Sequence, residues 1–365
     1  MTSKGRRGSK EAVNDDTTQP ITCGFVEDNC RKWAQKNLYE KINERSMPFR
    51  EIVREFKTHK DWKPLQFSSV CWKKNSEKNR YSDQMCIDAT RVILKNRDPD
   101  NDYINASWMT MPDGRRWIST QGPIKNTVED FWHMIYTEKV KVIVMLCQFQ
   151  EDKVEKSREY FNLEGKKIEQ YGPYKIRVKT KSTEVLPTIK MTILECEKDK
   201  QTTTVHHFWH TSWVDHFCPT EAQTTIGMFK MVLEKADKEP VVVHCSAGVG
   251  RTATFIGIDY ASQKISADAD TKMVEVLFAL RRMRFRAIQS QLQYAFLFQC
   301  LAELFMQEGC LKKDENFEKL KHNFEAIVKK LIKAQKAAKD KYYAKKAADQ
   351  KAGLVSREDP ATSGA

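Results

Sequence analysis

The spacing of apolar and polar positions changes along the chain from helical to strand-like and back to helical. Apolar residues from Phe25 to Phe56 recur at helical spacings with an interruption near Pro48, which predicts short amphipathic helices. The run from Val140 to Phe149 is short, apolar and β-branched, as expected of a strand buried on both faces. Between residues 174 and 209, apolar and polar residues alternate in three segments. This alternation predicts antiparallel strands with one solvated face.

A second buried strand and a helical region complete this part of the chain. Val241 to Val243 predicts the strand, and the apolar spacing after Thr252 is helical through three segments that end near Met306. Strands followed by helices, with mixed sheet character, predict an α/β or α+β domain.

A long C-terminal helix is predicted over residues 312–351. Its apolar residues alternate at spacings of three and four and form a seam, which consists of Phe317, Leu320, Phe324, Ile327 and Leu331. This stretch holds 13 Lys and no Arg against 6 Asp plus Glu, a net charge of +7. One interpretation is a solvated helix whose seam packs on the preceding domain or fades into disorder. The other is recruitment to an anionic membrane surface or an acidic partner, or a coiled-coil contact. Sequence-specific nucleic-acid binding is not expected.

Length and composition fit one large domain with tails. The 365 residues are 40% hydrophobic and 10% aromatic, which favours a packed core, and the net charge is +13. We expect a disordered polar arm over 1–20, the folded domain over 21–311, the lysine-rich helix over 312–351 and a disordered tail over 352–365. The polar start, the absence of a long apolar run and ten scattered cysteines without a CxxC pair predict a cytoplasmic protein, peripheral to a membrane at most.

Candidate chemistry lies in PVVVHCSAGVGRTATF, residues 240–255. A buried strand ends at His244, a cysteine follows, and small residues lead through Arg251 into a helix. Small residues let successive backbone N–H groups converge on one point, and the positive end of the helix faces that point. Arg251 adds a guanidinium that matches two phosphate oxygens. Cys245, at the edge of such an anion site, is favoured as a thiolate and is therefore a candidate nucleophile.

HCSAGVGRT, residues 244–252, resembles the H-C-x5-R signature of the cysteine-based protein tyrosine phosphatases, in the form typical of the tyrosine-specific branch. Together with the absence of a long apolar run, the resemblance favours a non-receptor member. Further stretches resemble family motifs in the family's order: KNRY (78–81), DYINAS (102–107), TQGP (120–123), DFW (130–132), VIVML (142–146) and QSQLQY (289–294). The resemblance covers roughly residues 49–306. It implies a highly twisted mixed sheet flanked by helices, no cofactor or metal, and phosphotyrosine-containing proteins as partners.

The resemblance also implies a role for each residue of the signature. Cys245 is expected to attack the phosphorus of phosphotyrosine and form a cysteinyl-phosphate intermediate. Arg251 and the loop amides are expected to hold the equatorial phosphoryl oxygens. These amides belong to Ser246, Ala247, Gly248, Val249, Gly250 and Arg251. His244 is expected to orient the loop and support the thiolate, and the Thr252 hydroxyl to stabilise Cys245 as it leaves.

Residues outside the signature receive roles from the same resemblance. Tyr81 is expected to stack on the substrate ring and Asp83 to accept backbone N–H groups of the substrate peptide. Gln289, with Gln293 nearby, is expected to position the hydrolytic water. Glu151 falls where the family places a carboxylate that pairs with the signature arginine.

The expected acid loop departs from the family pattern. The family usually carries Trp-Pro-Asp and a closing proline, and its aspartate protonates the tyrosyl leaving oxygen. Here the segment reads WVDHFCP, residues 213–219, so Trp213 and the acid Asp215 remain while Val214 replaces the first proline. Phe217 and Cys218 replace the usual Gly-Val. Loss of the fixed φ of proline leaves the open loop more freedom to lose on closing. We therefore expect an active enzyme whose turnover is affected more than its substrate affinity.

Other interpretations remain open at this point. A phosphotyrosine-binding module with little catalytic power would also retain the anion site, and a scaffold would act mainly through its lysine-rich tail. A dual-specificity phosphatase is disfavoured because Tyr81 implies a deep pocket. In isolation, Tyr81 and Asp215 are ordinary loop residues. A metal site at the histidines of residues 206–210 is disfavoured because strand alternation sends His206 and His207 to opposite faces.

Overall fold

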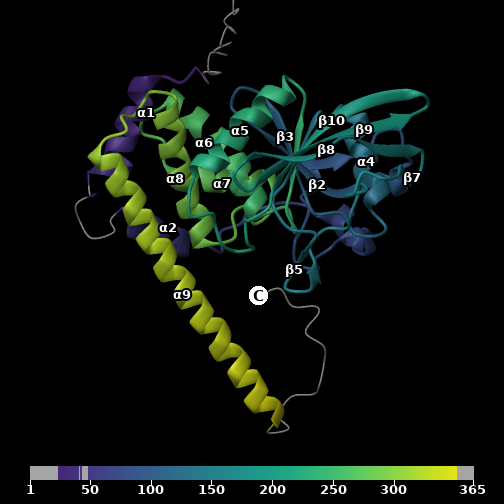
Figure 1. Cartoon of the computed structure of the whole chain (residues 1–365). Coiled ribbons are helices and arrows are strands. Elements are labelled where there is room, and N and C mark those ends of the chain that lie inside the picture. Colours follow the sequence, from purple (N-terminus) through teal and green to yellow (C-terminus); the bar gives the residue numbers. More distant parts are fainter. Residues whose placement is uncertain (1–23, 41, 43–47, 352–365) are drawn as a thin grey trace, which may run out of the picture.

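The computed structural model describes residues 24–40, 42 and 48–351. In this part of the chain, nine strands form one twisted sheet in the order β1-β2-β3-β11-β4-β10-β9-β8-β7 (Figure 1). The strands are β1 (Arg91–Ile93), β2 (Tyr103–Thr110), β3 (Arg116–Thr120), β4 (Val142–Met145), β7 (Glu169–Tyr171), β8 (Tyr174–Leu186), β9 (Ile189–Lys198), β10 (Gln201–His210) and β11 (Val241–His244). A separate two-stranded hairpin consists of β5 (Gln150–Glu151) and β6 (Val154–Glu155).

The central strands run parallel and the outer strands antiparallel. β11 pairs in parallel with β3 and β4, and β4 pairs in parallel with β10. The pairs β8–β9 and β9–β10 are antiparallel. The predicted mixed sheet is thereby confirmed. The two predicted buried strands are also present, but the one expected over residues 140–149 is shorter, as β4, and the one expected over 241–243 is β11. Because the central strands are parallel, the loops that follow β4, β10 and β11 meet at one edge of the sheet.

Helices cover both faces of the sheet. They are α1 (Glu27–Ala34), α2 (Phe49–His59), α3 (Val70–Lys74), α4 (Val128–Thr137), α5 (Gln223–Ala236), α6 (Arg251–Ala267), α7 (Met273–Met283), α8 (Gln291–Gln307) and α9 (Glu315–Lys351). Val142 and Val144 of β4 point into the larger core with α5, α6 and α8, whereas Ile143 points into a smaller core with α4. Figure 1 shows the same division, with α5 to α8 on one side of the sheet and α4 on the other.

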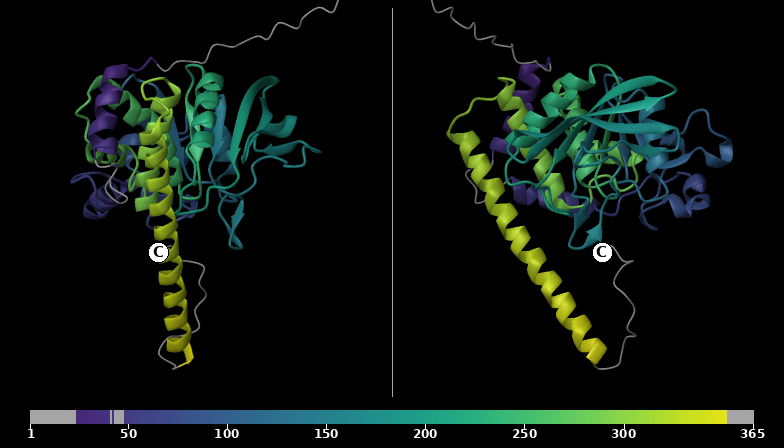
Figure 2. Two further views of the ribbon diagram at one scale, coloured as in Figure 1. Left: turned by 60° about the vertical axis from the view of Figure 1, so that its left-hand side comes forward. Right: turned by 45° about the vertical axis from the view of Figure 1, so that its right-hand side comes forward.

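The predicted C-terminal helix is present as α9, and its two halves differ. Phe317, Leu320, Phe324, Ile327 and Val328 are buried in the larger core. The Phe324 ring lies 5.2 Å from Phe49 of α2 and 6.0 Å from Phe296 of α8, between ring centroids. Beyond Leu331, which is half-buried, the helix continues away from the domain (Figures 1 and 2). The predicted seam therefore packs on the domain, and only the part of α9 beyond it projects.

Several predictions from the sequence fall on other parts of the chain. The polar arm over 1–20 and the tail over 352–365 lie outside the described residues. Among the residues that are described, no helix combines the length and the apolar character needed to cross a membrane.

Candidate active site

The candidate nucleophile lies where β11 gives way to α6, at the sheet edge described above. Cys245 follows the last strand residue, and its side chain is only 3% exposed. The backbone N–H of Gly248 points at the sulfur, with 3.3 Å between N and Sγ. Gly248 has a φ of +70°, and a Cβ at this position would lie 2.2 Å from the Thr120 carbonyl oxygen. Only glycine fits this turn, which brings the loop back over Cys245.

The carbonyl groups of the loop are bonded to the surrounding protein. The Ser246 carbonyl accepts a hydrogen bond from the Gly122 N–H (2.9 Å), and the Val249 carbonyl accepts one from the Ile288 N–H (2.8 Å). Because these peptide carbonyls are bonded to the scaffold, the loop N–H groups are left free to face the cysteine, as the Gly248 N–H does. The predicted anion site therefore has a rigid backbone frame.

A buried arginine that the sequence analysis did not identify supplies further bonds to the same frame. Arg284 Nε donates to the Gly248 carbonyl (3.1 Å), and its Nη2 donates to the Ala247 carbonyl (3.0 Å). Arg284 is fully buried, and this burial lowers its pKa. Its signal in the sequence is weak, since it lies in the basic stretch RRMRFR (281–286), which is typical of a protein surface.

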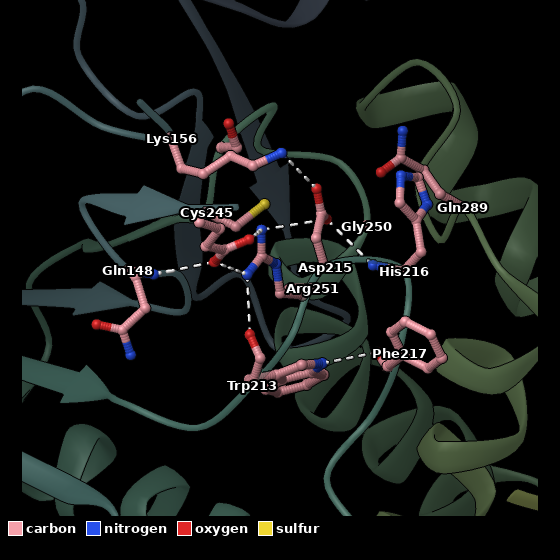
Figure 3. A network of polar contacts seen from close by, with 12 residues as sticks. Gln148, Lys156, Trp213, Asp215, His216, Phe217, Cys245, Gly250, Arg251 and Gln289 are labelled. Atoms are coloured by element: carbon pink, nitrogen blue, oxygen red, sulfur yellow. Dashed lines mark hydrogen bonds and ion pairs between the residues drawn. The ribbon is translucent and has the colours of Figure 1, made fainter. Parts of the chain in front are cut away.

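The Arg251 guanidinium contacts oxygens of three residues (Figure 3). Its Nη1 lies 2.6 Å from Glu151 Oε1 and 2.8 Å from the Trp213 carbonyl, and its Nη2 lies 3.1 Å from Asp215 Oδ1. Burial alone would lower its pKa, but the neighbouring anionic groups, Cys245 and Asp215 first, raise it overall. Within the described residues, its Nε has no hydrogen-bond partner. That N–H remains available to an oxyanion beside Cys245.

Asp215 reaches the same site from the acid loop. Its Oδ2 lies 3.2 Å from Lys156 Nζ, and its Oδ1 accepts a hydrogen bond from the His216 N–H (3.1 Å) as well as contacting Arg251. Burial raises the pKa of this carboxyl, but Arg251, His216 and Lys156 outweigh burial and lower it. The carboxyl is therefore ionised in this arrangement. Trp213 fixes the loop base through its indole N–H, which donates to the Phe217 carbonyl (2.9 Å).

His244 belongs to a buried chain of three rings. The Tyr160 hydroxyl lies 2.9 Å from His244 Nε2 and 2.6 Å from His207 Nε2, and His244 Nδ1 lies 3.1 Å from the Cys245 carbonyl oxygen. Burial lowers the pKa of His244 to about 4 and that of His207 to about 3. Both imidazoles are thus neutral near pH 7, and the hydrogen bonds among the three rings fix the orientation of His244 beside the cysteine.

The loop that carries Tyr81 borders the site on another side. The Tyr81 hydroxyl lies 2.7 Å from Ser246 Oγ. Asp83 is exposed, and its carboxylate pairs with Arg286 at 2.9 Å. Arg286 is a second basic residue of the 281–286 stretch that the sequence analysis did not single out.

The glutamine loop closes the site next to Gly250. A Cβ at Gly250 would lie 2.6 Å from Gln289 Oε1 and 2.9 Å from Gln293 Nε2, so the missing side chain lets both glutamines approach. Gln293 Oε1 accepts hydrogen bonds from the N–H groups of Gln289 (3.0 Å) and Ser290 (3.2 Å) as part of the α8 cap. The Thr252 hydroxyl lies buried at the start of α6, without a hydrogen-bond partner among the described residues.

Within the described residues, the histidines of β10 do not gather into a metal site. His207 belongs to the ring chain, and His210 is buried against Trp213 with 5.6 Å between ring centroids. Neither ring nitrogen of His210 has a hydrogen-bond partner in the described part of the chain, and burial lowers its pKa to about 4. Across the described residues, no cluster of three His, Cys, Asp or Glu side chains has the arrangement needed to hold a metal ion.

Comparisons with known proteins agree with this geometry. The family model "Protein-tyrosine phosphatase" matches residues 75–303. Mouse tyrosine-protein phosphatase non-receptor type 18 is 31% identical over 291 residues, 74% of this chain and 64% of the relative. Human non-receptor type 9 is 34% identical over 265 residues, 66% of this chain and 44% of the relative. The chain thus corresponds to less than two thirds of the length of either relative.

Solved structures show the same likeness. The catalytic domain of human non-receptor type 18 superposes with a TM-score of 0.63 at 27% identity, covering 76% of this chain and 99% of that one. A structure of that phosphatase in complex with HER2 phospho-peptides superposes with a TM-score of 0.65, also at 27% identity, covering 76% of this chain and 100% of the other. Because the family model spans more than half of the sequence, and Cys245, Arg251 and Asp215 lie together in one site, the chain belongs to the protein-tyrosine phosphatase family.

Proposed function

We propose that this protein hydrolyses phosphotyrosine in proteins through a cysteinyl-phosphate intermediate. One observation carries the proposal: Arg251, buried beside Cys245, is bonded at once to Glu151, Trp213 and Asp215 (Figure 3). A phosphoryl group bound at Arg251 would therefore have a nucleophile on one side and a carboxyl on the other. This arrangement is the one that in-line phosphoryl transfer requires.

In the first step, the Cys245 thiolate attacks phosphorus and the bond from phosphorus to the tyrosyl oxygen breaks. Asp215 gives its proton to that oxygen, so the tyrosyl side chain of the substrate protein leaves as the neutral phenol. Arg251 and the loop N–H groups carry the negative charge of the equatorial oxygens through the transition state. Arg284, Gly122 and Ile288 donate hydrogen bonds to the loop carbonyls, and these bonds keep the loop N–H groups in place before substrate arrives.

The ion pairs of Asp215 explain how its proton is controlled. Arg251 and Lys156 favour the carboxylate. A phosphate dianion at Arg251 competes for the same guanidinium and adds negative charge beside the carboxyl, and both effects favour its protonated form. We propose that substrate binding itself converts Asp215 into an acid. A phosphotyrosine that binds as the monoanion carries a proton on its phosphoryl group, and this proton can be transferred to Asp215.

In the second step, water attacks phosphorus and the bond from Cys245 to phosphorus breaks. Asp215, now a carboxylate, accepts a proton from this water. Gln289 is the glutamine placed to orient the water, because its side chain lies against Gly250 while Gln293 Oε1 is committed to the α8 cap. Inorganic phosphate and the free thiolate are then regenerated.

Phosphotyrosine-containing proteins are the proposed substrates, and we propose a second contact through α9. From residue 333 to 351 the sequence has 7 Lys against 2 Asp plus Glu, so most of the excess charge lies beyond the packed half. In the packed half, lysines pair with neighbouring glutamates, for example Lys319 with Glu315 at 2.8 Å. The projecting half would bind an anionic membrane surface or an acidic partner peripherally.

The packed and projecting halves of α9 predict different effects of truncating the chain. Ending it near Gly309 would uncover the pocket of Phe324 and destabilise the domain, whereas ending it after residue 333 should leave hydrolysis unchanged and weaken vesicle binding. Sedimentation with phosphatidylserine vesicles and with neutral vesicles measures the contact. Equal binding of the full chain and the chain ending at residue 333 would contradict it.

The catalytic proposal is tested by steady-state hydrolysis of a phosphotyrosyl peptide. The Cys245→Ser variant should be slower by at least about 10³-fold, because serine lacks an anionic nucleophile at neutral pH. The Cys196→Ser variant is a matched control, since burial raises the pKa of the Cys196 thiol to about 12 and this cysteine lies on β9, outside the site. A wild-type rate no higher than that of Cys245→Ser would overturn the proposal and favour a phosphotyrosine-binding module.

A further inference from the structure

The acid loop is bonded to the glutamine loop at a single hydroxyl group. Ser290 Oγ donates a hydrogen bond to the His216 carbonyl oxygen at 2.8 Å. The same Oγ accepts a hydrogen bond from the Gln293 N–H at 3.2 Å and thereby caps α8. A serine hydroxyl has one proton and two lone pairs, so it makes both bonds at once. Ser290 therefore connects the residue next to the acid with the start of a buried helix.

The residue that receives this bond has a strained backbone. His216 has a φ of +60°, in the left-handed region that favours glycine. A non-glycine residue stays there only where surrounding contacts hold it. Both polar backbone groups of His216 are held: its N–H donates to Asp215 Oδ1 (3.1 Å), and its carbonyl accepts from Ser290. The next residues of this loop, Phe217 and Cys218, are not glycines, so no neighbouring glycine can take over the left-handed turn from His216.

The position of Ser290 is itself fixed by the glutamine loop. Gln293 Oε1 accepts hydrogen bonds from the N–H groups of Ser290 (3.2 Å) and Gln289 (3.0 Å). Figure 3 shows Gln289 beside His216. The two loops that serve the first and second chemical steps are thus joined within one small network.

We propose that Ser290 is a positioning residue that latches the acid loop in the position where Asp215 reaches Arg251. This inference rests on the proposed function. Loss of a neutral hydrogen bond of this kind changes an equilibrium constant, here that between the loop positions, by about threefold to tenfold. Losing it shifts the loop toward positions in which Asp215 cannot protonate the leaving group, while Cys245 and Arg251 keep their places.

Three substitutions separate the latch from the helix cap. Ser290→Thr keeps a hydroxyl for both bonds. Ser290→Asp keeps a good cap for the Gln293 N–H but has no proton to donate to the His216 carbonyl. Ser290→Ala loses both bonds. Thermal unfolding identifies the cap, and Ser290→Asp is expected to melt close to wild type.

Two substrates with different leaving groups test the hydrogen bond from Ser290 to the His216 carbonyl. A phosphotyrosyl peptide has a poor leaving group that needs the acid, whereas a nitrophenyl phosphate has a better one that needs it less. We expect kcat for the peptide to fall about threefold to tenfold in Ser290→Asp and Ser290→Ala, with a smaller fall for the nitrophenyl ester, little change in KM, and wild-type behaviour in Ser290→Thr. Equal losses for the two substrates, or a loss confined to Ser290→Ala, would overturn the latch.

A readout without turnover keeps the latch separable from the catalytic proposal. The Trp213 indole N–H, bonded to the Phe217 carbonyl, reports the loop position in NMR spectra of the protein alone. The latch requires its exchange to increase in Ser290→Asp and not in Ser290→Thr, and unchanged exchange would overturn it. Failure of the catalytic proposal appears elsewhere, as equal rates of the wild type and Cys245→Ser.

Discussion

The proposed phosphate-binding loop (residues 244–251) and the proposed acid loop (residues 213–219) meet at Arg251 but are built differently. The phosphate-binding loop is almost entirely buried, and its carbonyls are bonded to the scaffold on several sides. In the acid loop, Val214 is 59% exposed, and a few hydrogen bonds hold the loop in place. One loop is preorganised by packing, and the other by contacts that can be broken singly. Substitutions in the first should therefore impair binding and catalysis together, and substitutions in the second mainly catalysis.

The largest effect that separates the two loops is expected for Asp215→Ala. Loss of the general acid should lower kcat for a phosphotyrosyl peptide by about 10²- to 10⁴-fold. Affinity should be retained or increased, because Asp215 no longer competes with phosphate for Arg251. Steady-state kinetics and a pull-down of phosphotyrosyl proteins measure the two quantities. A parallel loss of binding would show that Asp215 holds substrate instead of protonating it.

Arg284→Met tests the frame of the phosphate-binding loop. The substitution leaves the Ala247 and Gly248 carbonyls without their charged donor, which should cost about 1–3 kcal/mol of stability and misplace the loop N–H groups. We expect both a higher KM and a lower kcat, in contrast to the acid-loop variants. Arg282→Met, which alters an exposed neighbour, is the control. Normal kinetics in Arg284→Met would mean that the frame does not depend on this side chain.

His210, which packs against Trp213 at the base of the acid loop, makes the stability of the protein depend on pH. Its pKa is about 4 in the folded protein against an ordinary value near 6.5, so between these values the unfolded chain binds a proton that the folded chain does not. The free energy of unfolding therefore falls as pH falls from about 6.5 to 4, by about 1.4 kcal/mol at pH 5.5 for this residue. His210→Phe should flatten this slope and stabilise the protein at pH 7, because it removes two ring nitrogens that have no hydrogen-bond partner among the described residues. Unchanged pH dependence in urea unfolding would contradict the burial of His210.

The smallest expected effect belongs to Val214. Val214→Pro restores the proline that the family usually has and removes conformational freedom from the open loop. The gain of about 0.4–1 kcal/mol corresponds to a twofold to fivefold higher kcat with KM nearly constant. Stopped-flow measurement of phenol release reports the change directly. A lower kcat would indicate that the closed loop of this chain does not accept the φ of proline.

The same contrast separates what the sequence could predict from what it could not. The signature segment identified Cys245 and Arg251 because local spacing alone builds the strand, turn and helix. It could not identify Arg284, since a buried arginine within a basic stretch has the pattern of a surface charge until its partners are placed. Ser290 lies 74 residues from the carbonyl that it binds, and no local pattern encodes that distance.

The C-terminal helix shows a similar limit. The spacing of its apolar seam predicted the helix and the face that packs, including Phe317 and Phe324. The partners of that face, among them Phe49 of α2, lie near the other end of the chain. The sequence therefore left open whether the seam packs on the domain. The structure places the first half of the helix in the core and lets only the second half project.

The central claim is that Cys245 and Asp215 act on a phosphoryl group held at Arg251. Rapid quenching of the reaction with a ³²P-labelled phosphotyrosyl peptide in alkaline SDS tests it most directly, because S-phosphocysteine is stable on the denatured protein at alkaline pH. The account predicts a burst of protein-bound label on Cys245, formed more slowly in Asp215→Ala, longer-lived in Gln289→Ala and absent in Cys245→Ser. Hydrolysis by the wild type without labelled Cys245 would contradict it.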